Sequence, residues 1–362
     1  MTVKLVDKND ILAMLAIFED LRFNLYELAP DKSSLTIDEA LFSYIEYFSL
    51  KNQAGPVDSL QIRDGRLKLK SLNPLSLMVN LRYLDLGAIG WIVDLSPLAN
   101  LTSLYYLELA EGVNIKDLSP LAQLKGLGIL ALYRFRLARD LKPLAALQSL
   151  TNLSLTGSGV LTNLEPLAAL TELILLDLSA SQLLHDLRPL TGLEGLKSLN
   201  LSGCPDLTNL ADLASLINLR YLNLADCPKI QDLAPLAGLK ELASLVLTGD
   251  RDINDLRPLA PLSSLTNLAL SGSFVDLGPL AGLDQLSYLS LSGCANLTDL
   301  GPLAGLGQLA HLDLSGCAGI SDLTPLSGLK NLNYLDLTGC ERVASLDSLA
   351  GQPSLKVAGW RG

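Results

Sequence analysis

Leucine recurs along most of this chain in L-x-L pairs that stand at a nearly constant interval. Twelve such pairs lie between Leu84 and Leu337, and successive pairs are 23 residues apart except for the step of 21 from Leu268 to Leu289. Alternation of apolar and other residues over each pair is typical of a short strand with one buried face. A unit of this size cannot bury its leucines alone, so neighbouring strands must stack. The pattern therefore predicts an α/β solenoid with a parallel sheet.

The second half of most units carries a proline that is followed by leucine. Proline has a fixed φ and no N–H donor, which favours the first position of a helical turn. We therefore expect a short helical turn in each repeat, on the side opposite the strands. The proline column stands at positions 74, 97, 120, 143, 166, 189, 235, 258, 279, 302 and 325, and Asp212 and Ser348 replace proline in two repeats.

A column of acids and asparagines accompanies these turns. A calcium site is one interpretation of such a column. The interchange of aspartate and asparagine favours another, in which a side-chain oxygen accepts backbone N–H groups at each turn. The column comprises Asp94, Asp117, Asp140, Asn163, Asp186, Asn209, Asp232, Asp255, Asp276, Asp299 and Asp322.

The five cysteines follow the same repeat. Three of the intervals between them are 23 residues, and an odd number without a CxxC pair argues against a closed disulfide framework and against a zinc site. Their column otherwise holds mainly small, weakly polar residues, which predicts a buried ladder of thiols and hydroxyls. Asp250 is the exception in this column, and we expect it to turn outward or to pair with Arg251. The cysteines are Cys204, Cys227, Cys294, Cys317 and Cys340.

The repeat period divides the chain into three parts. Residues 1–58 lack it and show two helical patterns, the second opened by a capping box of Thr36 and Glu39. We therefore predict a helical N-terminal cap at 1–58. Residues 59–345 are the solenoid with about twelve regular repeats, and 346–362 form a C-terminal capping coil that closes the core.

Charge and hydropathy limit the classes of partner. The formal net charge is −11, and an acidic protein is repelled by phosphate backbones and anionic lipid. No apolar run approaches the roughly 18 to 20 residues that a membrane-spanning helix needs, and the first ten residues lack the apolar core of a secretory signal. We expect a cytoplasmic chain, monomeric on its own, with neither nucleic acid nor membrane as a partner.

The string DLSPLANLTSLYYLELA at residues 94–110 resembles the leucine-rich repeats of bacterial internalins. The likeness covers about residues 60 to 360, with cysteine-containing repeats of 23 residues where internalins usually have 22. The resemblance implies a leucine-rich-repeat horseshoe with a parallel β-sheet on the concave face, short helical turns on the convex face and a helical N-terminal cap. It also implies a protein partner that binds on the concave sheet.

The residues that flank the buried strand leucines are the candidate contacts on the concave face. They are rich in tyrosine, acids and small hydroxyl residues, a composition typical of protein-binding faces. Two acidic-aromatic clusters suit a basic partner segment, whereas Asp177 and Tyr221 lie between them. The N-terminal cluster is Tyr83, Asp85, Tyr106 and Glu108, and the C-terminal cluster is Tyr288, His311, Asp313, Tyr334 and Asp336. Tyrosine also packs well on any sheet, and this plain structural explanation stays open.

One basic-aromatic loop stands out in the acidic chain. The segment YRFRLARD is a second candidate contact region at the rim of the solenoid. It brings together Tyr133, Arg134, Phe135, Arg136 and Arg139.

The sequence favours a non-catalytic function. His311 two residues before Asp313 could imitate a base and its orienting carboxylate, yet no nucleophile accompanies them. The chain has no phosphate-binding loop, no dinucleotide fingerprint and no HExxH pattern. We expect no catalytic residue, no cofactor and no metal, and therefore a protein-interaction module that binds through its concave face. One alternative is a structural or inhibitory subunit that contacts its partner through the N-terminal cap, and a remote one is an enzyme or small-ligand binder.

Overall fold

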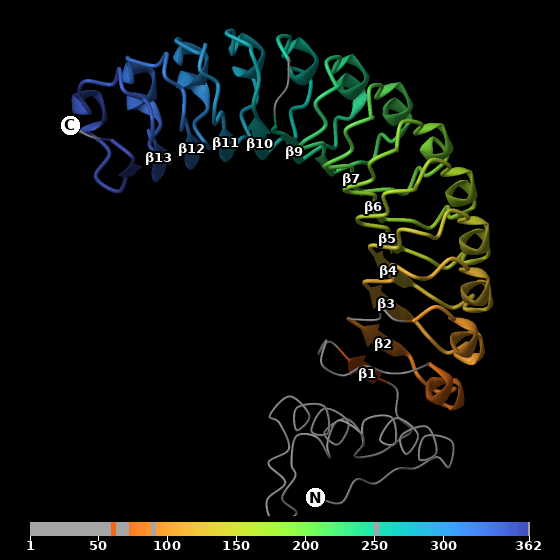
Figure 1. Cartoon of the computed structure of the whole chain (residues 1–362). Coiled ribbons are helices and arrows are strands. Elements are labelled where there is room, and N and C mark those ends of the chain that lie inside the picture. Colours follow the sequence, from red (N-terminus) through yellow and green to blue (C-terminus); the bar gives the residue numbers. More distant parts are fainter. Residues whose placement is uncertain (1–58, 63–71, 88–91, 250–252, 361–362) are drawn as a thin grey trace, which may run out of the picture. The chain divides into compact units, whose positions relative to one another are not determined.

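The computed structural model describes residues 59–62, 72–87, 92–249 and 253–360 of the chain. The helical cap predicted at residues 1–58 and the environment of Asp250 lie outside these residues. The chain divides into two compact units, residues 1–176 and 177–362. In both units, parallel strands alternate along the chain with short 3-10 helices, so the predicted repeat of strand and helical turn is confirmed (Figure 1).

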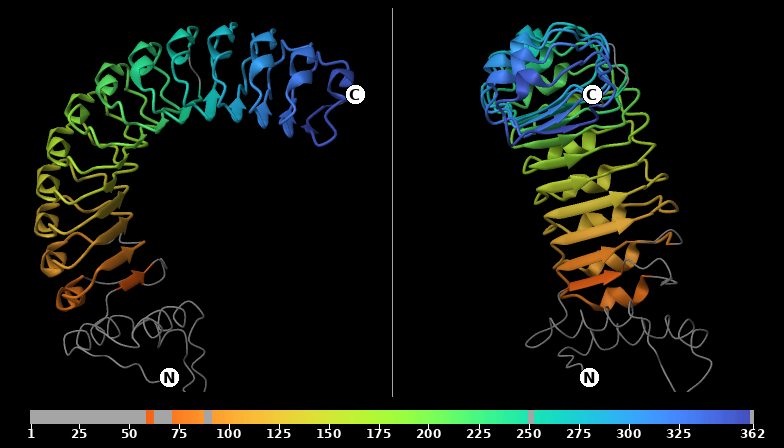
Figure 2. Two further views of the ribbon diagram at one scale, coloured as in Figure 1. Left: turned by 180° about the vertical axis from the view of Figure 1, so that it is seen from behind. Right: turned by 90° about the vertical axis from the view of Figure 1, so that its left-hand side faces the viewer.

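The strands of each unit lie in sequence order and pair in parallel. In the first unit the order is β1 (Ser59–Ile62), β2 (Tyr83–Leu86), β3 (Tyr106–Ala110), β4 (Ile129–Tyr133) and β5 (Asn152–Ser154), and β6 (Leu175–Asp177) lies at the division. In the second unit the order is β7 (Ser198–Asn200), β8 (Tyr221–Asn223), β9 (Ser244–Leu247), β10 (Asn267–Leu270), β11 (Tyr288–Ser290), β12 (His311–Asp313), β13 (Tyr334–Asp336) and β14 (Lys356–Ala358). Figure 2 shows the strands of each unit side by side.

The 3-10 helices lie on the side of each unit opposite the strands (Figure 1). Proline stands in the first turn of most of them, as predicted, whereas η7 and η13 form without it. In the first unit they are η1 (Asn73–Leu77), η2 (Ser96–Asn100), η3 (Ser119–Gln123), η4 (Lys142–Ala146) and η5 (Glu165–Ala169). In the second they are η6 (Arg188–Leu190), η7 (Ala211–Ser215), η8 (Ala234–Gly238), η9 (Arg257–Leu259), η10 (Gly278–Leu280), η11 (Gly301–Gly305), η12 (Thr324–Gly328) and η13 (Asp347–Leu349).

The core between strands and 3-10 helices is built of leucine. Leu312 in β12 and Leu326 in η12 are both 0% exposed, and the same holds at most equivalent positions. The unit of 21 residues does not disturb the ladder, since Leu268 of β10 is the partner of Leu289 in β11. A helix of three residues at η10 takes up the shorter chain.

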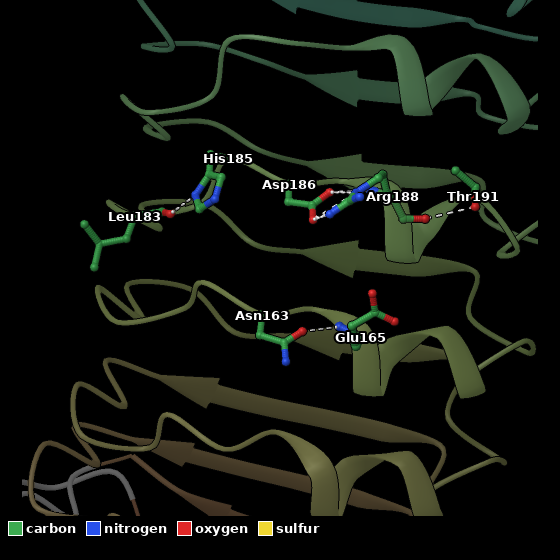
Figure 3. A network of polar contacts seen from close by, with 7 residues as sticks. All are labelled: Asn163, Glu165, Leu183, His185, Asp186, Arg188 and Thr191. Atoms are coloured by element: carbon green, nitrogen blue, oxygen red, sulfur yellow. Dashed lines mark hydrogen bonds and ion pairs between the residues drawn. The ribbon is translucent and has the colours of Figure 1, made fainter.

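The column of acids and asparagines closes the turn before each 3-10 helix. Figure 3 shows two examples: Asn163 accepts the backbone N–H of Glu165 at 2.8 Å, and Asp186 accepts that of Arg188 at 3.0 Å. Asp186 also binds the Arg188 guanidinium at 2.7 Å, which lowers the pKa of its carboxyl to about 2. The side-chain interpretation of this column is therefore confirmed, because these oxygens serve backbone donors.

The predicted ladder of buried thiols is also confirmed. All five cysteines are free and buried. The thiols of Cys227, Cys317 and Cys340 each donate to a leucine carbonyl in the preceding repeat at 3.1 Å. Each of these bonds joins two repeats within the second unit, so the thiol column contributes to the stacking of repeats as well as to the core.

Candidate functional site

The residues on either side of each buried strand leucine form a second, solvent-facing surface. In β12, Leu312 is fully buried whereas His311 and Asp313 are partly exposed. Successive side chains of a strand point to opposite faces of the sheet, which explains the alternation. We call the flanking residues of β2 to β13 the strand face, and it carries the predicted contact residues apart from the Arg134 loop.

In the first unit, two tyrosines of the strand face stack. The Tyr83 and Tyr106 rings lie 4.2 Å apart between centroids at an interplanar angle of 10°. The Tyr106 hydroxyl donates a hydrogen bond to Glu108. Loss of solvation, together with the nearby Glu108 carboxylate, raises the pKa of Tyr106. The tyrosine pair is thus held by an acid of the same strand.

Asp85 is a correction to the predicted N-terminal cluster. The sequence placed it on the accessible concave face, but its side chain is 0% exposed. Its strand β2 lies between β1 and β3, with Gln61 and Glu108 as its register partners, and this interior position in the sheet leaves it no access to solvent. Asp85 is therefore not part of the accessible strand face.

In the second unit, three rings of the predicted C-terminal cluster form one continuous stack. The Tyr288 and His311 ring centroids lie 4.6 Å apart, and those of His311 and Tyr334 lie 4.4 Å apart, with interplanar angles of 15° and 8°. These residues are register partners in β11, β12 and β13. We call Tyr288, His311 and Tyr334 the aromatic stack.

Two carboxylates lie beside the aromatic stack. Asp313 accepts the backbone N–H of Ser315 at 2.9 Å with Oδ1 and the Ser290 hydroxyl at 2.9 Å with Oδ2. The Asp336 Oδ1 accepts the backbone N–H of Thr338 at 2.8 Å. Bonds from the side chain and backbone of Thr338 lower the pKa of Asp336. Both acids are therefore fixed in position by the ends of their own strands.

The Tyr334 hydroxyl links the aromatic stack to these carboxylates. It donates to the Asp336 Oδ2 over 3.4 Å. Partial loss of solvation and the nearby Asp336 carboxylate raise the pKa of Tyr334. The ring consequently stays protonated and neutral at physiological pH, with its edge directed by the acid.

The two remaining strand-face predictions lie apart from the aromatic stack. Asp177 at the end of β6 accepts the backbone N–H of Ser179 at 2.9 Å and the Asn200 amide at 3.1 Å. Tyr221 in β8 is partly exposed and is separated from Tyr288 by the strands β9 and β10. The structure thus brings together the C-terminal cluster and leaves these two outside it.

The predicted basic-aromatic loop needs one correction. Arg134 is exposed, has a φ of 60° and forms an ion pair with Glu111 at 2.8 Å. Phe135 was expected at the rim, but it is 2% exposed and belongs to the core. Its ring occupies the space in which a Cβ of Gly112 would stand. The loop therefore presents arginine without the phenylalanine.

The sequence analysis missed the stacking of rings on the strand face. Aromatic residues 23 positions apart become direct neighbours when strands pair in register, and Tyr288 with His311 and His311 with Tyr334 show this interval. Neighbouring strands lie about 4.8 Å apart, which is close to the separation of stacked rings. The repeat interval was thus the signal that could have found the aromatic stack.

The part of the chain that the structure describes contains no group of three or more histidines, cysteines, aspartates or glutamates arranged to hold a metal ion. The same residues include no helix that is long and apolar enough to cross a membrane. His311 and Asp313 alternate with a buried leucine on one strand, and both are already engaged, by the ring stack and by the serine donors. This arrangement is that of a structured surface.

Comparisons with known proteins agree with the architecture. The family model for leucine-rich repeats in two copies matches residues 308–351. The crystal structure of an internalin, InlF, from Listeria monocytogenes is similar over 95% of both chains, with 28% identity and a TM-score of 0.73. The chain is a leucine-rich-repeat protein that resembles the Listeria internalins. A comparison with curated proteins gave no match.

Two further solved structures share the fold of this leucine-rich-repeat protein. The Leptospira interrogans protein LIC12759 is 24% identical, covers 80% of this chain and 81% of its own, and has a TM-score of 0.63. The functional domain of InlJ from Listeria monocytogenes, described as including a cysteine ladder, is 19% identical with a TM-score of 0.56. That match covers 78% of this chain and 63% of the InlJ chain. The five buried cysteines of this protein form a similar ladder.

Proposed function

We propose that this leucine-rich-repeat protein is a non-catalytic interaction module that binds a partner protein through the strand face of its second unit. The aromatic stack is the observation that carries the proposal. Three rings held parallel at 4.4 to 4.6 Å provide a preformed, partly exposed surface. Rigid aromatic area costs little conformational entropy on binding, which is why aromatic residues dominate the energetics of many interfaces.

The internalin-like fold supports this proposal in general terms. Leucine-rich-repeat proteins of this type are typically protein-binding and non-catalytic, and the partner of this chain is the unknown. The cytoplasmic location predicted from the sequence, the monomeric state and the exclusion of nucleic acid and membrane as partners stay predictions. The alternative in which the N-terminal cap makes the contact concerns residues outside those that the structure describes.

Replacing the two tyrosines of the aromatic stack tests the proposal. Serine is a suitable substituent, because Ser198 and Ser244 occupy the same strand position in β7 and β9. We expect tagged Tyr288→Ser/Tyr334→Ser protein to lose a partner that the wild-type protein captures from a lysate of the source organism. Loss of two central aromatic contacts of about 2 kcal/mol each would weaken binding by roughly 100-fold or more. Quantitative mass spectrometry of the eluates gives the readout.

Tyr221→Ser is the matched control for this experiment. It removes a tyrosine from the same face of the same unit, but from a strand outside the aromatic stack. The control should keep the partner, and circular dichroism should show all proteins equally folded. A partner that is captured equally by the wild type and by the Tyr288→Ser/Tyr334→Ser variant would contradict the proposed site and favour the N-terminal cap.

A further inference from the structure

The strand face of the second unit has an uneven distribution of charge. Among the strand residues of β7 to β14, Asp313 and Asp336 are acidic and Lys356 is the one basic residue. Both acids lie directly beside the aromatic stack, as register partners in β12 and β13. The negative charge of this face is therefore concentrated where its aromatic area is concentrated.

The hydrogen bonds of these two carboxylates leave capacity for a ligand. An ionised carboxylate has about four acceptor positions. Asp313 uses one for the Ser315 N–H and one for the Ser290 hydroxyl, and Asp336 uses one for the Thr338 N–H and one for the Tyr334 hydroxyl. All these donors are neutral, so each carboxylate keeps its full negative charge. Their positions are fixed before a ligand arrives.

The aromatic stack has one end that faces a small polar neighbour. The register partner of Tyr288 on β10 is Asn267, which is exposed, and next to it in the strand is the small Ala269. At the other end, the register partner of Tyr334 is Lys356 on β14, so a cation of this chain already stands beside that ring. A planar cation placed over Asn267 would lie about 4.8 Å from Tyr288, at the spacing of one strand, and would continue the stack.

We propose that the aromatic stack, together with Asp313 and Asp336, recognises an arginine-containing basic segment of the partner protein. This inference rests on the proposed function and adds the chemistry of the partner to it. A guanidinium group stacks on the face of an aromatic ring and also pairs with carboxylates, so it satisfies both features of the site. Lysine offers only a compact charge, and an acidic segment would be repelled by both carboxylates and by the net charge of −11.

Short labelled peptides are the probes that test this chemistry on the full chain. The three probes are fluorescein-labelled peptides of ten residues in which serine alternates with arginine, with lysine or with glutamate. Fluorescence anisotropy at low and at physiological ionic strength measures their binding. We expect the arginine peptide to bind about threefold more tightly than the lysine peptide, and the glutamate peptide not to bind.

A double variant, Asp313→Asn/Asp336→Asn, removes the charge and keeps the backbone contact. Asn200 and Asn223 occupy the same position in β7 and β8 and accept the equivalent backbone N–H at 3.1 and 2.9 Å, so asparagine is compatible with the fold. We expect this variant to bind the arginine peptide about tenfold more weakly than the wild type. Lys356→Gln should strengthen binding about twofold, because it removes a positive charge next to Tyr334.

The matched control is Asp299→Asn/Asp322→Asn. It removes the same two charges on the opposite side of the unit, where Asn209 shows that asparagine closes the same turn at 2.8 Å. This control should bind the arginine peptide within twofold of the wild type, which separates the site from a general effect of net charge. Equal loss in both double variants, or equal affinity for arginine and lysine peptides, would overturn the inference.

The failure of this inference and that of the proposed function have different signatures. If the captured partner is lost by Tyr288→Ser/Tyr334→Ser but retained by Asp313→Asn/Asp336→Asn, the strand face binds a partner and the basic segment is wrong. If both variants retain the partner, the proposed function itself fails. Loss of the partner in both variants, together with selective binding of the arginine peptide, supports both.

Discussion

Replacing Phe135 by alanine is expected to lower the free energy of unfolding by about 3 to 5 kcal/mol, the range for a buried phenylalanine. The ring is 2% exposed and fills the space above Gly112, where a Cβ would collide with it. The alanine variant would therefore leave a cavity lined by leucines of neighbouring repeats. Urea unfolding followed by circular dichroism measures the loss.

Two further variants separate this packing from a general effect on the loop. Leu137→Ala changes a residue of the same loop that is 41% exposed, and it should cost less than about 1 kcal/mol. Gly112→Ala should destabilise by about 1 to 3 kcal/mol through overpacking, and by less when Phe135 is also alanine. A Phe135→Ala protein within 1 kcal/mol of the wild type would show that the ring is not part of the core.

Raising the pH from 8 to 11 is expected to destabilise the wild-type protein strongly through the thiol ladder. Burial raises the pKa of Cys204 and Cys317 to about 12 and that of Cys294 to about 11. The unfolded chain, with ordinary thiols near about 8.5, loses these protons first. The contribution is therefore complete below about pH 8.5 and declines as the pH rises toward the folded values, by up to about 1.4 kcal/mol per pH unit for each thiol.

The triple variant Cys204→Ser/Cys294→Ser/Cys317→Ser isolates this effect. Serine does not titrate in this range, and Ser158 and Ser181 occupy the same column in buried positions. Tyrosines and lysines titrate equally in both proteins, so the difference in unfolding free energy between pH 8 and pH 11 reports the thiols. We expect the variant to lose several kcal/mol less than the wild type over this interval. Parallel losses would contradict the ladder as a buried, protonated array.

The repeat period explains why much of the fold could be predicted. Each leucine of an L-x-L pair serves the same purpose in every repeat, so one strand such as His311–Asp313 describes the others. The cysteine column and the acid and asparagine column could be interpreted for the same reason. Both hold interchangeable residues of similar chemistry, and this interchange identifies a structural function even without coordinates.

The errors concern residues that depart from their columns. Phe135 stands where other repeats have cysteine or serine, and only the glycine at position 112 one repeat earlier explains how a ring fits there. Asp85 follows the alternation of its strand, and its burial depends on the neighbouring strands. Such positions depend on a specific neighbour in the adjacent repeat, which a pattern averaged over repeats does not contain.

The candidate site lies between these two cases. Its residues could be chosen from the sequence, because the flanking strand positions are known once the leucines are assigned. The stacking of His311 between Tyr288 and Tyr334 and the use of Asp313 and Asp336 as strand-end acceptors needed the structure. Ring orientation and hydrogen-bond direction depend on side-chain rotamers, which an alternating pattern does not determine.

Hydroxyl-radical footprinting of the complex with the captured partner tests the central claim most directly. Mass spectrometry follows the oxidation of single side chains in the free and the bound protein. We predict that Tyr288, His311 and Tyr334 oxidise several times more slowly in the complex, whereas Tyr105, which is 49% exposed outside the aromatic stack, keeps its rate. Unchanged oxidation of the three stacked rings, with protection confined to residues 1–58 or to the Arg134 loop, would contradict the account.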